Sequence, residues 1–194
     1  VAAGAKLTLA PGSYLSLHVA KGAEVTFSGG LYSFKEWHVA DSSKLFFAGT
    51  SEVRISGQVQ AGMNSYVGPA ANSTVTARQI TIFVAGVNAN VGNLGGLGGK
   101  AATFGPYATL AANVVVPNGT LLIRERSKAV GSFVGRWVSV GKFSELTLAN
   151  RFGSLIEGRN ADFVSLTLDE AVGLNATAPL SVDVDAELLT EEGS

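Results

Sequence analysis

The sequence predicts an all-β fold: a single-stranded, right-handed parallel β-helix, or β-solenoid, with short coils of about 17–20 residues. Three observations predict it. A unit of strand, small-residue turn and strand recurs along the chain, apolar residues alternate with polar ones within it, and its period is too short to contain a helix. Such a coil buries its apolar side only against neighbouring coils, so stacked copies form a parallel sheet on each flank.

The first coils lie near the start of the chain. The segment 17–27 reads LHVAKGAEVTF, and the segment 37–47, one period later, reads WHVADSSKLFF. The segments 6–9 (KLTL) and 14–17 (YLSL) belong to the same pattern, with the turn signal Pro11-Gly12 between them. Small residues allow the chain to turn at the corners of each coil: Gly22, Gly29, Gly30, Ser42, Ser43 and Gly49.

The pattern continues less regularly in the middle of the chain. Strands are expected at residues 31–34 and 52–55, and weaker copies of the unit at Val59 and at residues 66–68. We place the copy at Val59 one period of 20 residues after Val39, and the copy at residues 66–68 the same period after Phe46-Phe47. No stretch has a helical period beyond two turns, and the best helix candidate, Asp185–Glu192, is short.

One interruption is expected in the second half. A strand at 79–84 is followed by a Gly-rich loop at Gly86–Gly105, a length typical of functional or mobile loops. The repeat resumes at residues 114–120 and has a copy at 121–129. Its last copy, at 138–148 (VSVGKFSELTL), begins one short period after Leu121. We expect seven or eight coils in a body spanning residues 1–150.

The composition excludes several classes of protein. The absence of cysteine among 194 residues excludes a disulfide scaffold, a thiolate zinc site and a cysteine nucleophile. A net charge of −1 gives no reason to expect nucleic acid as a partner. The three long uncharged stretches are broken by Gly, Pro or Asn, so no membrane span is expected. Charged residues make up 15% of the chain, against about 25% in ordinary domains, which suits a surface that is buried in an assembly.

The charges are unevenly distributed along the chain. Residues 1–150 contain twelve Lys or Arg and six Asp or Glu, whereas residues 151–194 contain two Arg and nine acidic residues. This acidic C-terminal segment also alternates as strands at 163–168 and 180–184. It either caps its own protomer or docks on a neighbouring one, where an open solenoid end offers an unpaired strand edge. The residues expected at such an assembly interface are Leu180, Val182, Asp183, Val184, Asp185, Glu187, Lys6, Leu7 and Leu9.

The order of these motifs resembles a known group of proteins. Six segments follow one another over about residues 5–150: LxPGSYxxLxV, GAxVTFSGGLYxF, ITIFVAG, the Gly-rich insertion, NVVVPNGTLLI and VGSFVGRWVSVGKFSELTL. This order resembles the right-handed β-helix domains of bacterial surface proteins, including those attached to pilin-like leaders, and is related in style to the bactofilins. Bactofilins polymerise end to end without a nucleotide, so the resemblance implies end-to-end polymerisation. It also implies a bacterial extracellular or cell-surface location after removal of a leader.

No residue pattern indicates catalysis, a cofactor or a metal site. His18 and His38 lie one coil apart and should stack on an outward face, but the next equivalent, placed at Gln58, adds no third ligand. The segment at 96–101 departs from a phosphate-binding loop, and Asp183, Asp185 and Glu187 lack calcium-loop spacing. We therefore expect no enzyme.

The expected function is a structural subunit of a filament or fibre that assembles head to tail with itself. One alternative is a monomeric, adhesin-like surface domain that binds a carbohydrate or a protein partner, with the Gly86–Gly105 loop as the candidate contact. Exposed aromatic residues on one flank would favour it, and Trp37 and Trp137 are the first candidates. The third alternative, a glycan-cleaving enzyme, requires a carboxylate cluster in a groove.

Overall fold

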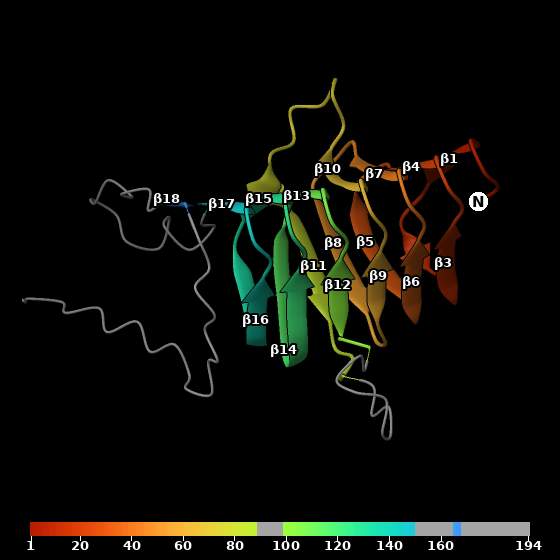
Figure 1. Cartoon of the computed structure of the whole chain (residues 1–194). Helices are drawn as coiled ribbons and strands as arrows, with labels where there is room; N and C mark the ends of the chain where they lie inside the picture. Colours follow the sequence, from red (N-terminus) through yellow and green to blue (C-terminus); the bar gives the residue numbers. More distant parts are fainter. Residues whose placement is uncertain (89–98, 150–164, 168–194) are drawn as a thin grey trace, which may run out of the picture.

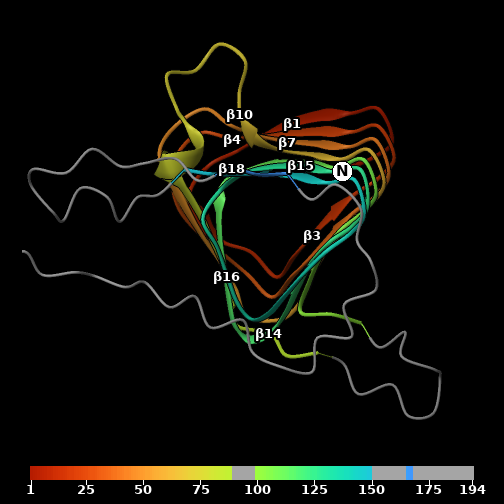
Figure 2. The same cartoon turned by 60° about the vertical axis from the view of Figure 1, so that its left-hand side comes forward.

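The chain forms a parallel β-solenoid of about seven coils, which confirms the fold class that the sequence predicts (Figure 1). The computed structural model describes residues 1–88, 99–149 and 165–167. Viewed towards its end, the solenoid has a three-sided outline around a central core (Figure 2). Each full coil therefore contributes one strand to each of three faces, rather than the two strands of the sequence unit.

Face 1 is an eight-stranded sheet in which successive strands come from successive coils. Its strands are β1 (Lys6–Leu9), β4 (Glu24–Phe27), β7 (Lys44–Phe47), β10 (Tyr66–Pro69), β13 (Thr109–Ala111), β15 (Lys128–Gly131), β17 (Glu145–Leu148) and β18 (Ser165–Thr167). All neighbours pair in parallel except β17 and β18, which are antiparallel.

Faces 2 and 3 belong to one ten-stranded sheet that bends around a corner. Face 2 contains β2 (Gly12–Ser13), β5 (Gly30–Phe34), β8 (Ser51–Ile55) and β11 (Ile80–Val84). Face 3 contains β3 (Ser16–Val19), β6 (Glu36–Val39), β9 (Val59–Ala61) and β12 (Ala102–Phe104). The long strands β14 (Asn113–Ile123) and β16 (Phe133–Val140) each extend over both faces, which joins them.

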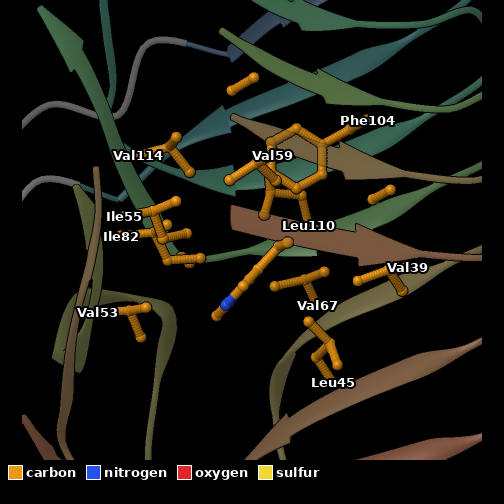
Figure 3. Close-up of a cluster of buried hydrophobic side chains, with 14 of the residues drawn as sticks. Val39, Leu45, Val53, Ile55, Val59, Val67, Ile82, Phe104, Leu110 and Val114 are labelled. Atoms are coloured by element: carbon orange, nitrogen blue, oxygen red, sulfur yellow. The ribbon is translucent and has the colours of Figure 1, made fainter. Parts of the chain in front are cut away.

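The core consists of the inward residues of all three faces, aligned in ladders along the solenoid. Alternate residues of each strand point inwards, as the period-2 pattern predicts. Figure 3 shows such side chains, including Leu45 and Val67 from successive coils of face 1. Near the N-terminal end, the buried Phe27 ring stacks on Phe47 with a centroid distance of 4.7 Å and on Trp37 at 5.7 Å.

The corner between faces 3 and 1 is built the same way in every coil. One residue there adopts a left-handed conformation, with φ between 56° and 70°: Gly4, Gly22, Ser42, Asn64, Tyr107, Arg126 and Phe143. The residue after it is usually a buried Ala or Ser. Ser43 and Ser144 each donate a hydroxyl hydrogen bond of 2.9 Å to a main-chain carbonyl of the preceding turn, which holds the corner closed.

Two details of the predicted repeat are wrong in the middle coils. Val59 pairs with Trp37, and Tyr66 pairs with Lys44, so this coil is longer than the unchanged period that the sequence pattern predicts. Consequently His38 is followed in its ladder by Gln60 and not by Gln58. Longer corners absorb the extra residues without breaking the ladders.

The predicted interruption is also placed differently. The repeat resumes at β12 and not at residue 114, because Ala102–Phe104 pairs with both β9 and β14 inside the range expected to be a loop. A second insertion, residues 70–79, separates β10 from β11 and ends in a 3-10 turn at Ala77–Gln79. Asn113 anchors this turn by donating its side-chain amide to the carbonyls of Ala77 and Arg78.

Candidate functional site

The first and last parallel strands of face 1 have nearly the same sequence. β1 reads Lys6-Leu-Thr-Leu9 and β17 reads Glu145-Leu-Thr-Leu148, so they differ only in the sign of the first side chain. Because every neighbouring pair in between is in register, Lys6 and Glu145 belong to the same outward ladder at opposite ends of the body. Three predicted interface residues, Lys6, Leu7 and Leu9, thus lie on the N-terminal end strand.

Both ends of the solenoid expose residues whose equivalents are buried elsewhere. Leu7 continues the inward ladder of Val25 and Leu45 but is 41% exposed, whereas both neighbours are fully buried. At the other end, Val138 is 43% exposed although its ladder neighbour Leu121 is fully buried. The hydrophobic core is therefore open at both ends, because no further coil of the described chain packs there.

The N-terminal end carries a cluster of alternating charges on face 1. The Glu24 carboxylate lies 2.9 Å from Lys6 Nζ and 3.4 Å from Lys44 Nζ. The hydrogen bond from Lys6 is the main reason why the pKa of Glu24 is lowered. At the opposite end, Lys128 Nζ lies 3.6 Å from Glu145. Since the three lysines and Glu145 are about half exposed or more, these pairs orient neighbouring strands more than they stabilise the fold.

A short C-terminal strand covers the outer edge of the last coil. In β18, Leu166 is opposite Leu146 and Thr167 is opposite Glu145, in an antiparallel pair with β17 of the same chain. This part of the acidic segment therefore folds back on its own protomer. All the C-terminal residues predicted at the interface lie outside the described residues: Leu180, Val182, Asp183, Val184, Asp185 and Glu187. The helix candidate Asp185–Glu192 also lies outside them.

Other candidate residues are placed on the lateral faces. His18 and His38 stack as expected, with ring centroids 5.0 Å apart. Among the described residues, no three His, Cys, Asp or Glu side chains converge on a position that suits a metal ion. Trp37 is buried in the core, whereas Trp137 is 50% exposed on β16, near the C-terminal end. Of the predicted Gly86–Gly105 loop, residues 89–98 lie outside the described residues.

Sequence reasoning missed a groove on face 2. It is lined by Tyr14, Phe34, Lys35, Arg54 and Phe83, which come from four successive coils. The pair Arg54–Glu52, with 2.7 Å between Nε and Oε1, crosses its surface. The period-2 pattern placed Arg54 and the neighbouring outward positions on the surface, but no motif indicated that they share a hollow.

The search for relatives returned no match to a family model, a curated protein or a solved structure. Within the described ranges, no helix is long and apolar enough to cross a membrane.

Proposed function

We propose that this chain is a structural subunit that assembles head to tail into a filament or fibre. The observation that carries the proposal is the match between the end strands β1 and β17. If the β1 strand of one copy followed β17 of another, Leu7 would meet Leu146 and Leu9 would meet Leu148. Both inward ladders would then continue across the junction, and the exposed ends of the core would be covered.

Charge fixes the direction of this contact. Lys6 of one copy would lie opposite Glu145 of the next, which repeats the Lys6–Glu24 pairing within the chain. A contact between two like ends would run the paired face 1 strands antiparallel, so the Lys6–Glu145 pair would be lost. A heterologous contact of this kind does not close on itself, so it generates a filament rather than a dimer.

Strand β18 competes for the same edge. Because β18 occupies the outer side of β17, stacking on face 1 requires β18 to leave. The outer edge of β16, on faces 2 and 3, has no strand partner within the described chain. It could receive β2 and the first residues of β3, since Val1 already bonds to the main chain of His18 and Ala20 at the end of β3. The resemblance to bactofilins supports end-to-end growth, and the resemblance to β-helix domains of bacterial surface proteins supports an extracellular or cell-surface setting.

Charge reversal tests the proposal. Lys6→Glu and Glu145→Lys should each reduce assembly, since each places like charges opposite one another at the junction. The double variant should restore assembly, because it exchanges the two charges. Assembly is measured by sedimentation velocity over a range of concentrations and by negative-stain microscopy.

Lys44→Glu is the matched control. It removes the other lysine that contacts Glu24, in the same ladder, but lies inside the body, so assembly should not change. A single species of 19.9 kDa at high concentration for the unaltered chain would contradict the proposal. So would a double variant that assembles no better than either single one.

A further inference from the structure

An elongated hollow crosses face 2 where that face turns towards face 3. It has a volume of about 550 Å³ and extends from Ser13 and Tyr14 in the first coil to Pro117 in the fifth. Because neighbouring strands lie about 4.8 Å apart, the four strand-to-strand steps give it a length of about 19 Å. A volume of this size is typical of small-molecule sites, which range over about 300–1,000 Å³.

The hollow results from the order of side chains in one outward ladder. Ser13 and Ser33 occupy this ladder in the first two coils, and Arg54 and Phe83 occupy it in the next two. The surface is therefore low over the serines and rises at the larger side chains. Phe83 is 42% exposed, so one aromatic side chain is presented to a ligand in the groove.

The floor and one wall are rigid. Phe34 is buried beneath the groove, and the Tyr14 ring stacks on it with a centroid distance of 5.3 Å. The Tyr14 hydroxyl donates a 2.7 Å hydrogen bond to the Ala10 carbonyl, which fixes the ring. A ligand would therefore meet a preformed floor and wall, and of the residues that contact it mainly the exposed Lys35 and Phe83 side chains would lose rotamer freedom.

The groove is positively charged. Glu52 neutralises Arg54, but the exposed ammonium of Lys35 has no carboxylate partner within the described ranges. The hydroxyls of Ser13, Ser33 and Ser56 likewise make no hydrogen bond with the described part of the chain. The lining thus combines an aromatic side chain, free hydroxyls and one uncompensated cation.

The topology argues against an extended peptide as the ligand. Such peptides commonly bind by adding a strand to a free sheet edge, where main-chain groups provide the hydrogen bonds. Strands β5, β8 and β11 are each paired on both sides, so their main-chain groups are already used. A ligand here must be recognised by side chains alone, which suits a sugar, with its apolar ring face and its many hydroxyls.

We infer that this groove binds an acidic oligosaccharide. A sugar ring packs against Phe83, a uronate carboxylate pairs with Lys35, and the serine hydroxyls bond to the sugar hydroxyls. The groove opens on a lateral face, and Lys35 and Phe83 belong to the second and fourth coils, so binding at these residues does not require head-to-tail assembly.

Calorimetric titration of the full chain with a hyaluronan hexasaccharide at low salt tests the inference. Binding is expected, and Phe83→Ala and Lys35→Ala should each weaken it by about tenfold. Added salt should weaken binding to the unaltered chain more than to the Lys35→Ala variant. Phe143→Ala and Lys142→Ala are matched controls, since both residues are located at the corner between faces 3 and 1, and neither should change the affinity.

Two further ligands distinguish the alternatives. Hexa-N-acetylchitohexaose, a neutral hexasaccharide, should bind more weakly, and equal binding would overturn the assignment of an acidic ligand. A hexaglutamate peptide should not bind, and equal binding would show recognition of charge alone and overturn the assignment of a sugar. Absence of hyaluronan binding, or binding that Phe83→Ala leaves unchanged while its circular dichroism spectrum is native, would overturn the site.

Discussion

Gly131 is the position where a single methyl group should most clearly disrupt the stacking of coils. It ends β15 with φ of +150°, and a Cβ atom there would overlap the main-chain carbonyl of Ala112 in the preceding coil. The overlap involves backbone on both sides, so no side-chain rotation can relieve it. Strain of about 1–3 kcal/mol from the dihedral angle and a similar cost from overpacking give a loss of about 2–6 kcal/mol for Gly131→Ala.

Gly22→Ala is the matched control. Gly22 also has a positive φ, of +70°, but no atom lies within 4 Å of the position that its Cβ would take. Only the left-handed conformation then opposes the substitution, at about 1–2 kcal/mol. The equivalent residues of the next two coils, Ser42 and Asn64, show that the corner accepts a side chain.

Urea denaturation followed by circular dichroism measures the difference. With an unchanged slope, the midpoint should fall much further for Gly131→Ala than for Gly22→Ala. In thermal unfolding, a gap of about 2 kcal/mol corresponds to about 4–8 °C for a chain of this size. Equal losses in the two variants would refute the argument that close approach between coils, rather than the dihedral angle, limits position 131.

Three further predictions concern the core, the charged ladder and the C-terminal strand. Phe27→Ala should lower the free energy of unfolding by about 3–5 kcal/mol, because it removes the buried ring that stacks on its neighbours in the core; urea titration measures this. The fold lowers the pKa of Glu24, so the carboxylate stabilises the folded chain fully above its usual pKa, and this stabilisation is lost as the pH falls through the lowered pKa. The melting temperature of Glu24→Gln should therefore fall less between pH 7 and pH 3 than that of the unaltered chain. Leu166→Pro removes a main-chain donor from β18 and should uncover the β17 edge, which would increase head-to-tail assembly in sedimentation experiments.

The regular parts of the fold were accessible to sequence reasoning because their physical cause is local. Inward positions such as Val25 and Leu45 must be apolar in every coil, so alternation recurs at a nearly fixed spacing. The longer middle coil was misplaced because a corner tolerates extra polar residues at no cost to the ladders. The insertion at 70–79 escaped notice for the same reason, since it contains no glycine to mark it.

The corner ladder could not be predicted from residue type. Left-handed positions are usually recognised by glycine or asparagine, yet here Tyr107, Arg126 and Phe143 also adopt the conformation. The Arg126 guanidinium lies 5.8 Å from the centre of the Tyr107 ring and 5.5 Å from that of Phe143, which offsets part of the strain. The conformation is imposed by coil stacking, a cause that acts between residues about one coil apart.

The candidate sites depend on topology even more. The resemblance between KLTL and ELTL has no meaning until the structure shows that these segments are the first and last parallel strands of one sheet. Likewise, Ser13 and Phe83 line one groove only because they belong to a single outward ladder that crosses the first four coils. The sequence alone establishes the periodicity. It does not establish where each residue lies along the solenoid axis.

The two proposals together make a joint prediction about ligand length. With seven coils spaced at about 4.8 Å, a head-to-tail stack would repeat the groove on face 2 about every 34 Å. A hexasaccharide shorter than this would occupy one groove and leave the size distribution unchanged. A long acidic polysaccharide would contact the grooves of successive protein copies. Once it is bound to one copy, its binding to the next is an intramolecular step, so the polysaccharide would favour assembly. If the long polysaccharide and the hexasaccharide change the sedimentation coefficient of the protein equally, the grooves of successive copies do not form one continuous surface.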